Sequence, residues 1–358
     1  MEKRLLLLAT TPFLNDGLTK IEFDVYEWYK NRIEFEFATP FETQNRFGEK
    51  LRDEGVQIIE LPDKKKVFSY LRAVFRAVKK GGYDVVYIHG NSALMGMQAI
   101  PSKLAGAGKV VAHCHNTKSD YPIVHYILKP FFNLAVDCKI GCSSLASKWA
   151  FSGKNVYTVP NGVDVNRFQY NSDARMRVRR DLGITDNTLI GHIGRFSRQK
   201  NHERILSVFS EYRSIDSGSK LLLIGSGEMK DEIIRRERDL GIQSDCIHIE
   251  ETSSPQDYMS AMDVMIMPSL FEGLCLVALE AQSNGLPLVI SDTFAPETIV
   301  TGNVTEISLE TDDKGWAEAL FHRINKTERY QLSENEKNQL SWQNMMDRIG
   351  EILLGGSE

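Results

Sequence analysis

Short apolar runs alternate with amphipathic stretches along the whole chain, and this alternation limits its fold more than any other feature. Each run has the length of a buried strand, and each amphipathic stretch is long enough for a helix that crosses back over a sheet. The pattern is typical of parallel β-sheets covered by helices. The expected strands are 4–10, 33–38, 57–61, 85–88, 110–114, 139–142 and 156–159, and then 189–193, 220–224, 247–249, 264–267, 288–291 and 306–309.

A turn cluster between the two groups of strands marks a domain boundary. Pro160 ends the last strand of the first group, and Asn161-Gly162 accepts a positive φ. A chain of 358 residues also exceeds what one hydrophobic core usually supports. We therefore expect an α/β protein with two Rossmann-like doubly wound parallel-sheet domains facing a cleft, residues 1–165 and 166–340. Ligands of such domains bind outside the carboxyl ends of the strands.

Composition excludes several classes of protein. Apolar residues make up 42% of the chain and charged residues 25%, as in ordinary folded proteins. A net charge of −5 provides no overall attraction for nucleic acid. The five cysteines lack the paired spacing of a zinc site and indicate buried thiols in a reducing compartment. Because no apolar stretch has the length of a membrane span, we expect a cytoplasmic protein that contacts a membrane only peripherally.

The segment 64–80 is a candidate for such a peripheral contact. It pairs Phe68, Leu71, Phe75 and Val78, at helical spacing, with seven cations, and the chain is otherwise net acidic. A basic amphipathic helix of this kind can lie on anionic lipid at the inner face of the membrane. The alternative is a crossover helix that packs on the core and has a solvated rim. Both interpretations stay open at this point.

The segment from Pro268 to Glu280 is the richest in chemical groups. Two carboxylates, Glu272 and Glu280, bracket a junction between a strand and a helix. Gly273 allows a tight turn, and the free amides of Leu274, Cys275 and Leu276 would form a helix-start anion site for a pyrophosphate. Glu280 could accept hydrogen bonds from a ribose diol. The alternative is a pair of solvated surface carboxylates, although Glu280 lies inside an apolar run.

A second loop combines Gly194 and Arg195 with Lys200 directly after a strand. The two cations could clamp the two phosphates of a nucleotide diphosphate and neutralise the leaving group without a metal. The alternative is a solvated basic loop, and we expect His192 and His202 to be packing or surface residues.

A third segment, Gly225-Ser226-Gly227, lacks the third glycine of a dinucleotide fingerprint. It is better interpreted as a backbone opening beside a nucleotide.

The first half of the chain offers fewer candidates. His113 and His115 stand two residues apart at the end of the expected strand 110–114, but no third metal ligand is evident. We therefore expect His115 to be a single cleft histidine and His113 a core residue. The turn Asn15-Asp16-Gly17 after the first strand is a modest candidate for anion binding. The tail 342–354 is an amphipathic helix that needs apolar surface to cover.

These segments, in this order, resemble the retaining glycosyltransferases of family 4, which have the GT-B fold and include many bacterial capsule and exopolysaccharide enzymes. The resemblance extends over the whole chain and is strongest from Pro160 to Pro296. Pro160 to Asp164 is similar to the interlobe turn of the family, and 194–202 resembles its phosphate-binding loop. Glu272 and Glu280 fit its E-x7-E motif.

The resemblance implies roles for individual residues. Arg195 and Lys200 would contact the donor diphosphate, Glu272 the donor sugar hydroxyls, Glu280 the ribose and His115 the transferred sugar. The last helix, 341–358, would cross back to the first lobe. Cys275 stands where Pro or Gly is common in the family, and Asp16 precedes a lone glycine, Gly17, where adjacent glycines are usual. The resemblance therefore does not identify the donor sugar.

The implied activity is transfer of a hexose from a nucleotide diphosphate sugar, with uridine as the expected nucleotide, to a saccharide or lipid-linked acceptor. The nucleotide sugar is a co-substrate, and no cofactor or metal is expected. Two alternatives remain: a nucleotide-sugar epimerase of the same fold, for which we identify no additional acid/base set, and a non-catalytic sugar-nucleotide-binding protein. A nicotinamide oxidoreductase would need Gly-x-Gly-x-x-Gly after the first strand, and the chain lacks it there.

Overall fold

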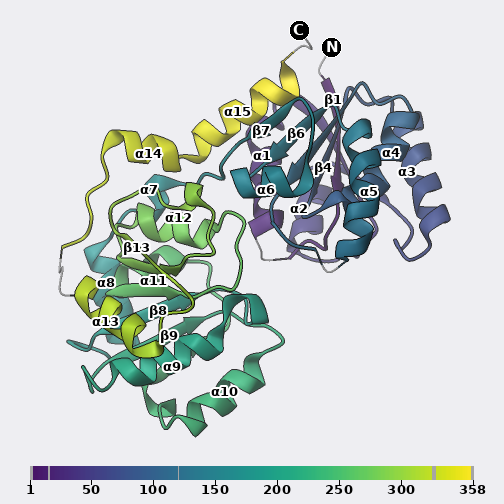
Figure 1. The fold of residues 1–358 in the computed structure, drawn as a ribbon. Helices are drawn as coiled ribbons and strands as arrows, with labels where there is room; N and C mark the ends of the chain where they lie inside the picture. Colours follow the sequence, from purple (N-terminus) through teal and green to yellow (C-terminus); the bar gives the residue numbers. More distant parts are fainter. Residues whose placement is uncertain (1–2, 15–16, 120, 325–327, 356–358) are drawn as a thin grey trace. The chain divides into compact units, whose positions relative to one another are not determined.

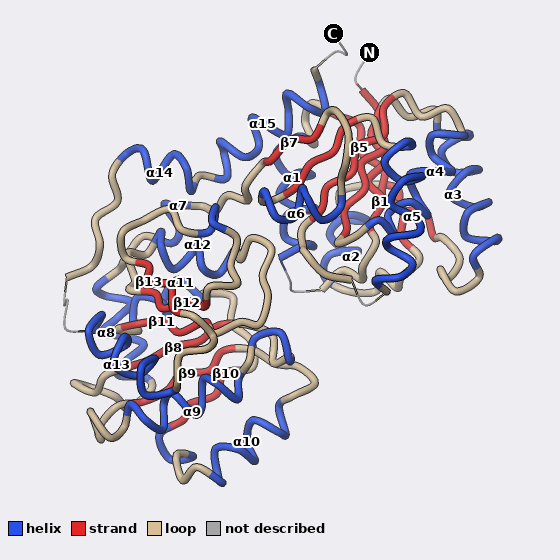
Figure 2. Tube along the Cα trace, in the orientation of Figure 1, coloured by secondary structure: helices blue, strands red, loops and turns tan. Residues whose placement is uncertain are grey.

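The computed structural model describes residues 3–14, 17–119, 121–324 and 328–355. The chain divides into two compact units, unit 1 with residues 1–161 and 345–358, and unit 2 with residues 162–344. Each unit contains one parallel β-sheet with helices packed against it (Figures 1 and 2). The predicted class of two Rossmann-like parallel-sheet units is therefore confirmed.

Unit 1 is built on a seven-stranded sheet in the order β3-β2-β1-β4-β5-β6-β7. The order reverses between β1 and β4, which makes the carboxyl ends of these two strands the topological switch point of unit 1. The strands are β1 (Lys3–Ala9), β2 (Ile33–Thr39), β3 (Gln57–Glu60), β4 (Val85–Gly90), β5 (Lys109–Cys114), β6 (Cys138–Gly141) and β7 (Val156–Thr158). The helices are α1 (Gly17–Tyr29), α2 (Arg46–Asp53), α3 (Val67–Gly81), α4 (Gly96–Leu104), α5 (Pro122–Ala135) and α6 (Ser144–Ala150), with a 3₁₀ turn η1 (Ala93–Met95).

The tail helix α15 (Trp342–Leu354) forms where the amphipathic pattern predicts it. Its buried residues Met346, Ile349 and Leu353 pack on unit 1. The hydroxyl of Tyr29 donates to the carbonyl of Met346, and Lys109 Nζ donates to the carbonyl of Ile352 at 3.0 Å. Apolar packing and these polar contacts together attach α15 to the sheet of unit 1.

Unit 2 is built on a six-stranded sheet in the order β10-β9-β8-β11-β12-β13, so its switch point lies between β8 and β11. The strands are β8 (Leu189–Ile193), β9 (Lys220–Ile224), β10 (Cys246–Ile249), β11 (Val264–Met267), β12 (Leu288–Ser291) and β13 (Val304–Ile307). The helices are α7 (Val165–Phe168), α8 (Ser172–Asp181), α9 (His202–Tyr212), α10 (Lys230–Asp239), α11 (Pro255–Ala261), α12 (Leu276–Ser283), α13 (Asp313–Ile324) and α14 (Glu334–Leu340), with 3₁₀ turns η2 (Arg198–Lys200), η3 (Gln243–Asp245) and η4 (Pro296–Thr298).

Alternate residues of the strands in unit 2 belong to two separate hydrophobic cores. Met265 and Met267 of β11 pack in one core, and Val264 and Ile266 pack in the other. A strand buried on both faces has to be apolar at every position, which is why these strands are visible as continuous apolar runs. The largest displacement is that of β13, predicted at 306–309: it forms at Val304–Ile307, where its residues are in register with β12.

No helix in the described ranges is both long enough and apolar enough to cross a membrane.

Candidate functional site

Two loops meet at the switch point of unit 2. We call residues 194–201, after β8, the β8 loop, and residues 268–275, after β11, the β11 loop. The side-chain amide of Asn201 donates to the carbonyl of Pro268 at 3.0 Å, and the amide of Leu270 donates to the carbonyl of Gln199 at 2.8 Å. Asn201 has a positive φ of 55°, which turns the chain from the β8 loop into α9. The two loops are thus fixed to each other at the edge of the sheet where ligands bind in this class of fold.

A buried ion pair joins the two loops. Lys200 Nζ lies 2.6 Å from Glu272 Oε1, and the side chains are 14% and 7% exposed. Gln199 Nε2 donates to the carbonyl of Phe271 at 3.0 Å and to Glu272 Oε2 at 3.3 Å. Lys200 Nζ also lies 3.8 Å from the sulfur of Cys275. The β8 loop is therefore not simply a solvated basic loop, and Glu272 is not a solvated surface carboxylate.

Burial and charge act against each other on these groups. Burial by itself lowers the pKa of Lys200, but Cys275 and Glu272 raise it, and the net result is a pKa above the ordinary value of lysine. Burial raises the pKa of the Cys275 thiol to about 11. At neutral pH the site consequently holds a protonated ammonium beside a neutral thiol.

Two glycines allow a third loop to approach the β8 loop. Gly225 and Gly227, after β9, have φ values of 146° and 156°. A Cβ at Gly225 would lie 2.0 Å from the carbonyl oxygen of Gly194, and one at Gly227 would lie 2.4 Å from that of Phe196. The amide of Gly194 donates to the carbonyl of Ile224 at 3.0 Å. The Gly-x-Gly sequence is thus explained by close packing of two backbones at the site.

Arg195 differs from Lys200 in its surroundings. Its side chain is 65% exposed and pairs with Glu228, also exposed, at 3.1 Å. An exposed pair of this kind contributes little to stability, so its guanidinium can exchange Glu228 for another anion. The structure therefore separates the two predicted cations into one that is buried and paired with Glu272 and one at the surface.

Helix α12 begins next to the ion pair. Gly273, Leu274 and Cys275 precede it, Leu276 is its first residue, and Glu280 lies one turn further along. The side chain of Glu280 is only 7% exposed. The amides of the first turn of a helix carry a partial positive charge, so this junction has the geometry of an anion site.

His192 and His202 are packing residues, which is one of the two alternatives expected from the sequence. Both are buried, and His192 Nδ1 bonds with the carbonyl of Ile266 at 2.9 Å. The ring of His202 packs edge-on against His192 and Phe196.

In unit 1 the structure adds a histidine that the sequence did not reveal. His115 follows β5 and keeps part of its surface exposed, while His113 is buried with its Nδ1 2.8 Å from the hydroxyl of Tyr87. His89 of β4 is the register partner of His113, and its Nδ1 lies 3.0 Å from Nε2 of His115. The sequence made no third ligand evident beside His113 and His115, and the structure places His89 there. Pairing between β4 and β5 brings His89 beside the other two histidines, and no sequence motif indicates this pairing.

Gly17, the other candidate in unit 1, is the first residue of α1. Asn15 and Asp16, which complete its turn, lie outside the described residues.

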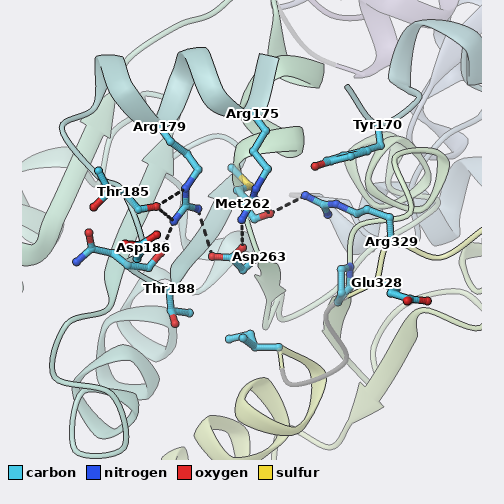
Figure 3. A pocket seen from close by; sticks show the side chains of 13 residues that line it. Tyr170, Arg175, Arg179, Thr185, Asp186, Thr188, Met262, Asp263, Glu328 and Arg329 are labelled. Atoms are coloured by element: carbon cyan, nitrogen blue, oxygen red, sulfur yellow. Dashed lines mark hydrogen bonds and ion pairs between the residues drawn. The ribbon is translucent and has the colours of Figure 1, made fainter. Parts of the chain in front are cut away.

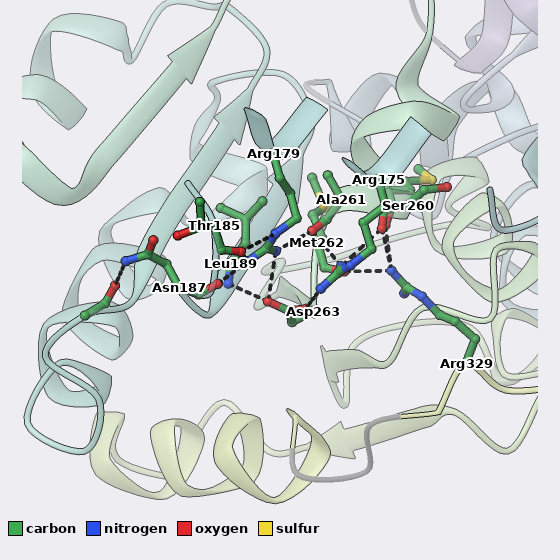
Figure 4. A network of polar contacts seen from close by, with 12 residues as sticks. Arg175, Arg179, Thr185, Asn187, Leu189, Ser260, Ala261, Met262, Asp263 and Arg329 are labelled. Carbon is green, nitrogen blue, oxygen red and sulfur yellow. Dashed lines mark hydrogen bonds and ion pairs between the residues drawn. The ribbon is translucent and has the colours of Figure 1, made fainter. Parts of the chain in front are cut away.

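A hollow of about 400 Å³ in unit 2 lies elsewhere (Figure 3). It opens at the amino ends of β8 and β11, beside Arg175, Arg179 and Arg329. These guanidiniums donate to the carbonyls that end α11, among them Ala261 and Met262, and Asp263 pairs with Arg175 at 2.6 Å (Figure 4). The arginines satisfy the carboxyl end of a helix, which is a structural role.

Comparison with known proteins bears on the identity of the chain. The structure of Anabaena HepE in complex with UDP superposes with a TM-score of 0.82, over 99% of this chain and all of that chain at 17% identity, which shows a common fold. Residues 175–339 match the family model described as glycosyl transferases group 1. The putative glycosyltransferase EpsF of Bacillus subtilis (strain 168) is 28% identical over 309 residues, 81% of this chain and 80% of the relative. The chain is a GT-B glycosyltransferase.

A second relative of this glycosyltransferase has a more detailed name. UDP-Gal:alpha-D-GlcNAc-diphosphoundecaprenol alpha-1,3-galactosyltransferase of Escherichia coli is 24% identical over 261 residues, 68% of this chain and 66% of the relative.

The packing of the glycine loop leads to a prediction about the stability of unit 2. We expect Gly225→Ala to destabilise the glycosyltransferase by about 1–3 kcal/mol more than Gly241→Ala, because only the first adds a steric collision to the strain of a positive φ. Gly241 is the matched control: its φ is 67°, and a Cβ there would meet nothing within 4 Å. Urea denaturation of both variants measures the difference. Equal losses would contradict the close approach described for Gly225.

Proposed function

We propose that this glycosyltransferase transfers a hexose from a uridine diphosphate sugar to a saccharide or lipid-linked acceptor in capsule or exopolysaccharide biosynthesis. The proposal includes retention of the anomeric configuration and a donor diphosphate neutralised without a metal. The observation that carries it is the buried pair of Lys200 and Glu272 beside the start of α12, at the switch point of unit 2. The named relatives are transferases, so they do not favour the epimerase or the non-catalytic alternative.

Each part of the donor has a proposed partner. Lys200, Arg195 and the amides of Leu274 to Leu276 would hold the diphosphate, with Gly194 and Gly225 giving the backbone room to approach it. Charge grows on the diphosphate as the glycosidic bond breaks, and fixed cations and amides stabilise that charge. Lys200 is already protonated and aligned by Glu272, so it would need little rearrangement.

The two carboxylates would act on different groups. Glu272 would accept hydrogen bonds from the donor sugar, and Glu280, buried one turn into α12, from the ribose. His115, at the carboxyl end of β5 in unit 1, is assigned to the transferred sugar. Burial lowers the pKa of His115 to about 3, so its imidazole would act as a neutral hydrogen-bonding group rather than a cation.

The choice of uridine rests on the relatives. The E. coli relative is named for UDP-Gal, and the HepE structure contains UDP. The E. coli name also includes a diphosphoundecaprenol acceptor, which supports a lipid-linked acceptor in the proposal.

A lipid-linked acceptor would require unit 1 to reach a membrane surface, and one face of unit 1 has the composition for it. Helices α3, α4 and α5 pack side by side in one layer (Figure 1). Phe68 on α3 is 89% exposed, and Ile123 and Leu134 on α5 are 75% and 82% exposed. Exposed large apolar side chains gathered on one layer are the composition expected of an interaction site. The further exposed apolar residues of this layer and its connections are Val67, Phe75, Leu104, Tyr121, Val124, Tyr126, Ile127 and Phe131.

The same stretch of chain is strongly basic. Between Lys64 and Val136 there are eleven lysines and arginines and two acidic residues, whereas the whole chain has 43 basic and 48 acidic residues. Apolar side chains with basic neighbours fit an anionic lipid surface, to which each nearby cation contributes about 1 kcal/mol. We propose that this face, which we call the α3–α5 face, docks on the inner leaflet.

The structure corrects one part of the sequence-based interpretation of 64–80. Val78 is buried rather than aligned with Phe68 and Phe75, which are exposed. Lys64 Nζ donates to the carbonyl of Thr10 at 2.6 Å, and burial lowers its pKa to about 8. Lys64 is therefore held by the protein, and most of the exposed apolar surface lies on α5.

The first prediction from this proposal is that UDP stabilises the enzyme equally with and without a chelator, because protein cations and amides meet the phosphate charge. Thermal unfolding with excess UDP measures the effect. A shift that requires Mg²⁺ or Mn²⁺, or an equal shift with a nicotinamide dinucleotide, would contradict the proposal.

The two carboxylates are expected to differ when replaced. Glu280→Ala should weaken UDP binding about 10–100-fold, the cost of one charged hydrogen bond made in ground and transition states alike. Glu272→Gln should reduce turnover about 100-fold while UDP affinity is kept or increased, because the charge of Lys200 is released from its partner. Calorimetry with UDP and steady-state kinetics separate the two effects. Equal weakening of UDP binding by both variants would show the assignment to be wrong.

The α3–α5 face can be tested apart from the donor site. The double variant Ile127→Ser and Phe131→Ser should bind anionic phospholipid vesicles more than tenfold more weakly than the wild type, since each buried side chain contributes about 1.5–3 kcal/mol. Met176→Ser with Ile215→Ser, exposed apolar residues of unit 2, is the matched control. Hydrolysis of the donor in solution should be unchanged in both. Absence of wild-type binding at low salt, or a dimer that the first variant dissociates, would overturn the lipid assignment.

A further inference from the structure

Three histidines of unit 1 gather on one face of its sheet. His89 on β4 and His113 on β5 are register partners, and His115 follows two residues after His113, so all three side chains extend from the same face. One ring nitrogen of each lies within 4.8 Å of the corresponding atoms of the other two. The rings of His113 and His115 have centroids 4.0 Å apart. The cluster is thus compact enough for its nitrogens to converge on one point.

Two nitrogens of the cluster have unused lone pairs or protons. Nε2 of His89 and Nε2 of His113 are buried and have no hydrogen-bond partner among the described residues. A buried polar atom without a partner costs about 1–3 kcal/mol, so such atoms usually indicate a ligand or a water. Here two of them occur in one group of three imidazoles.

We propose that His89, His113 and His115 form a binding site for one divalent transition metal ion of the zinc and cobalt class. Imidazole nitrogens suit these ions, whereas Mg²⁺ and Ca²⁺ require oxygen ligands. Three histidines leave a fourth coordination position for water or another ligand. The proposed function assigns the diphosphate of the donor to residues of unit 2, and none of these three histidines is among them.

A neighbouring hydroxyl supplies the hydrogen bond that orients a histidine for metal binding. The hydroxyl of Tyr87 bonds with Nδ1 of His113, which leaves Nε2 of that ring as the nitrogen for a metal.

Occupancy would have a consequence for catalysis that rests on the proposed function. An imidazole that coordinates a metal cannot at the same time use that nitrogen to contact the transferred sugar, so the ion would inhibit transfer through His115. Metal binding itself does not depend on that assignment, and it can be measured without a donor.

The test is a titration of the metal-free, full-length protein with Co²⁺, followed by its visible absorption. We expect one equivalent to give the absorption of cobalt in a tetrahedral nitrogen site, and Zn²⁺ to remove it by competition. His89→Gln should abolish the signal. Tyr87→Phe, which removes only a hydroxyl, should weaken binding about 10–100-fold and serves as the variant least disturbing to folding. Thermal unfolding without metal checks that each variant is folded.

The exposed His322 on α13 provides the control, since His322→Gln should bind cobalt like the wild type. Wild-type binding no tighter than that of folded Tyr87→Phe, or a signal that is lost in His322→Gln, would overturn the site. Cobalt binding at this site without inhibition of transfer would leave the metal site standing and contradict the role of His115. Inhibition of transfer without the absorption change would overturn the metal site alone.

Discussion

The ion pair between Lys200 and Glu272 is the interaction on which the donor side of the structure depends. Burying two charges costs several kcal/mol per ion, and only close pairing with additional hydrogen bonds compensates for it. Gln199 and the short distance of 2.6 Å supply that compensation. Removing one partner from such a pair typically costs about 3–5 kcal/mol, so the two loops that carry it are strongly held in one arrangement.

The position of this pair follows from strand order. The chain runs outward from β8 to β10 on one side and from β11 to β13 on the other, so connections leave β8 and β11 in opposite directions. The space between diverging connections is where a ligand can enter without displacing a helix. A buried salt bridge in that space contributes little net stability, because the desolvation of both charges opposes it. This is the physical reason to connect the pair with binding of a charged substrate.

Much of the fold was predictable because strands buried on both faces must be apolar throughout. All thirteen expected strands form within the described residues, and the tail helix has the predicted bounds 342–354. The candidate residues of unit 2 also fall after β8, β9 and β11, on the loops that follow these strands or, for Leu276 and Glu280, in helix α12. What periodicity could not supply was register: β13 begins two residues before the expected position because its partner β12, not its own hydropathy, sets its ends.

The contacts that were not predictable link residues far apart in the sequence. Lys200 and Glu272 are 72 positions apart, and neither segment carries a sign that the other is its partner. His89 is a lone histidine in an apolar strand, and its place beside His115 depends on strand pairing. The exposed face of α5 was missed for the opposite reason. An apolar helix usually indicates a core, and the sequence does not report which side the core covers.

Helix α15 has a consequence for the order in which the protein can be completed. During synthesis the amino-terminal 161 residues emerge first, yet the segment that covers part of their sheet is made only after the whole of unit 2. Until then the groove that receives Met346, Ile349 and Leu353 is exposed on the ribosome-bound chain. Unit 2 has all its residues at that moment and unit 1 does not, so the second unit to be translated can be the first to finish folding. A chaperone that protects the nascent chain would therefore have to act on the earlier half for longer.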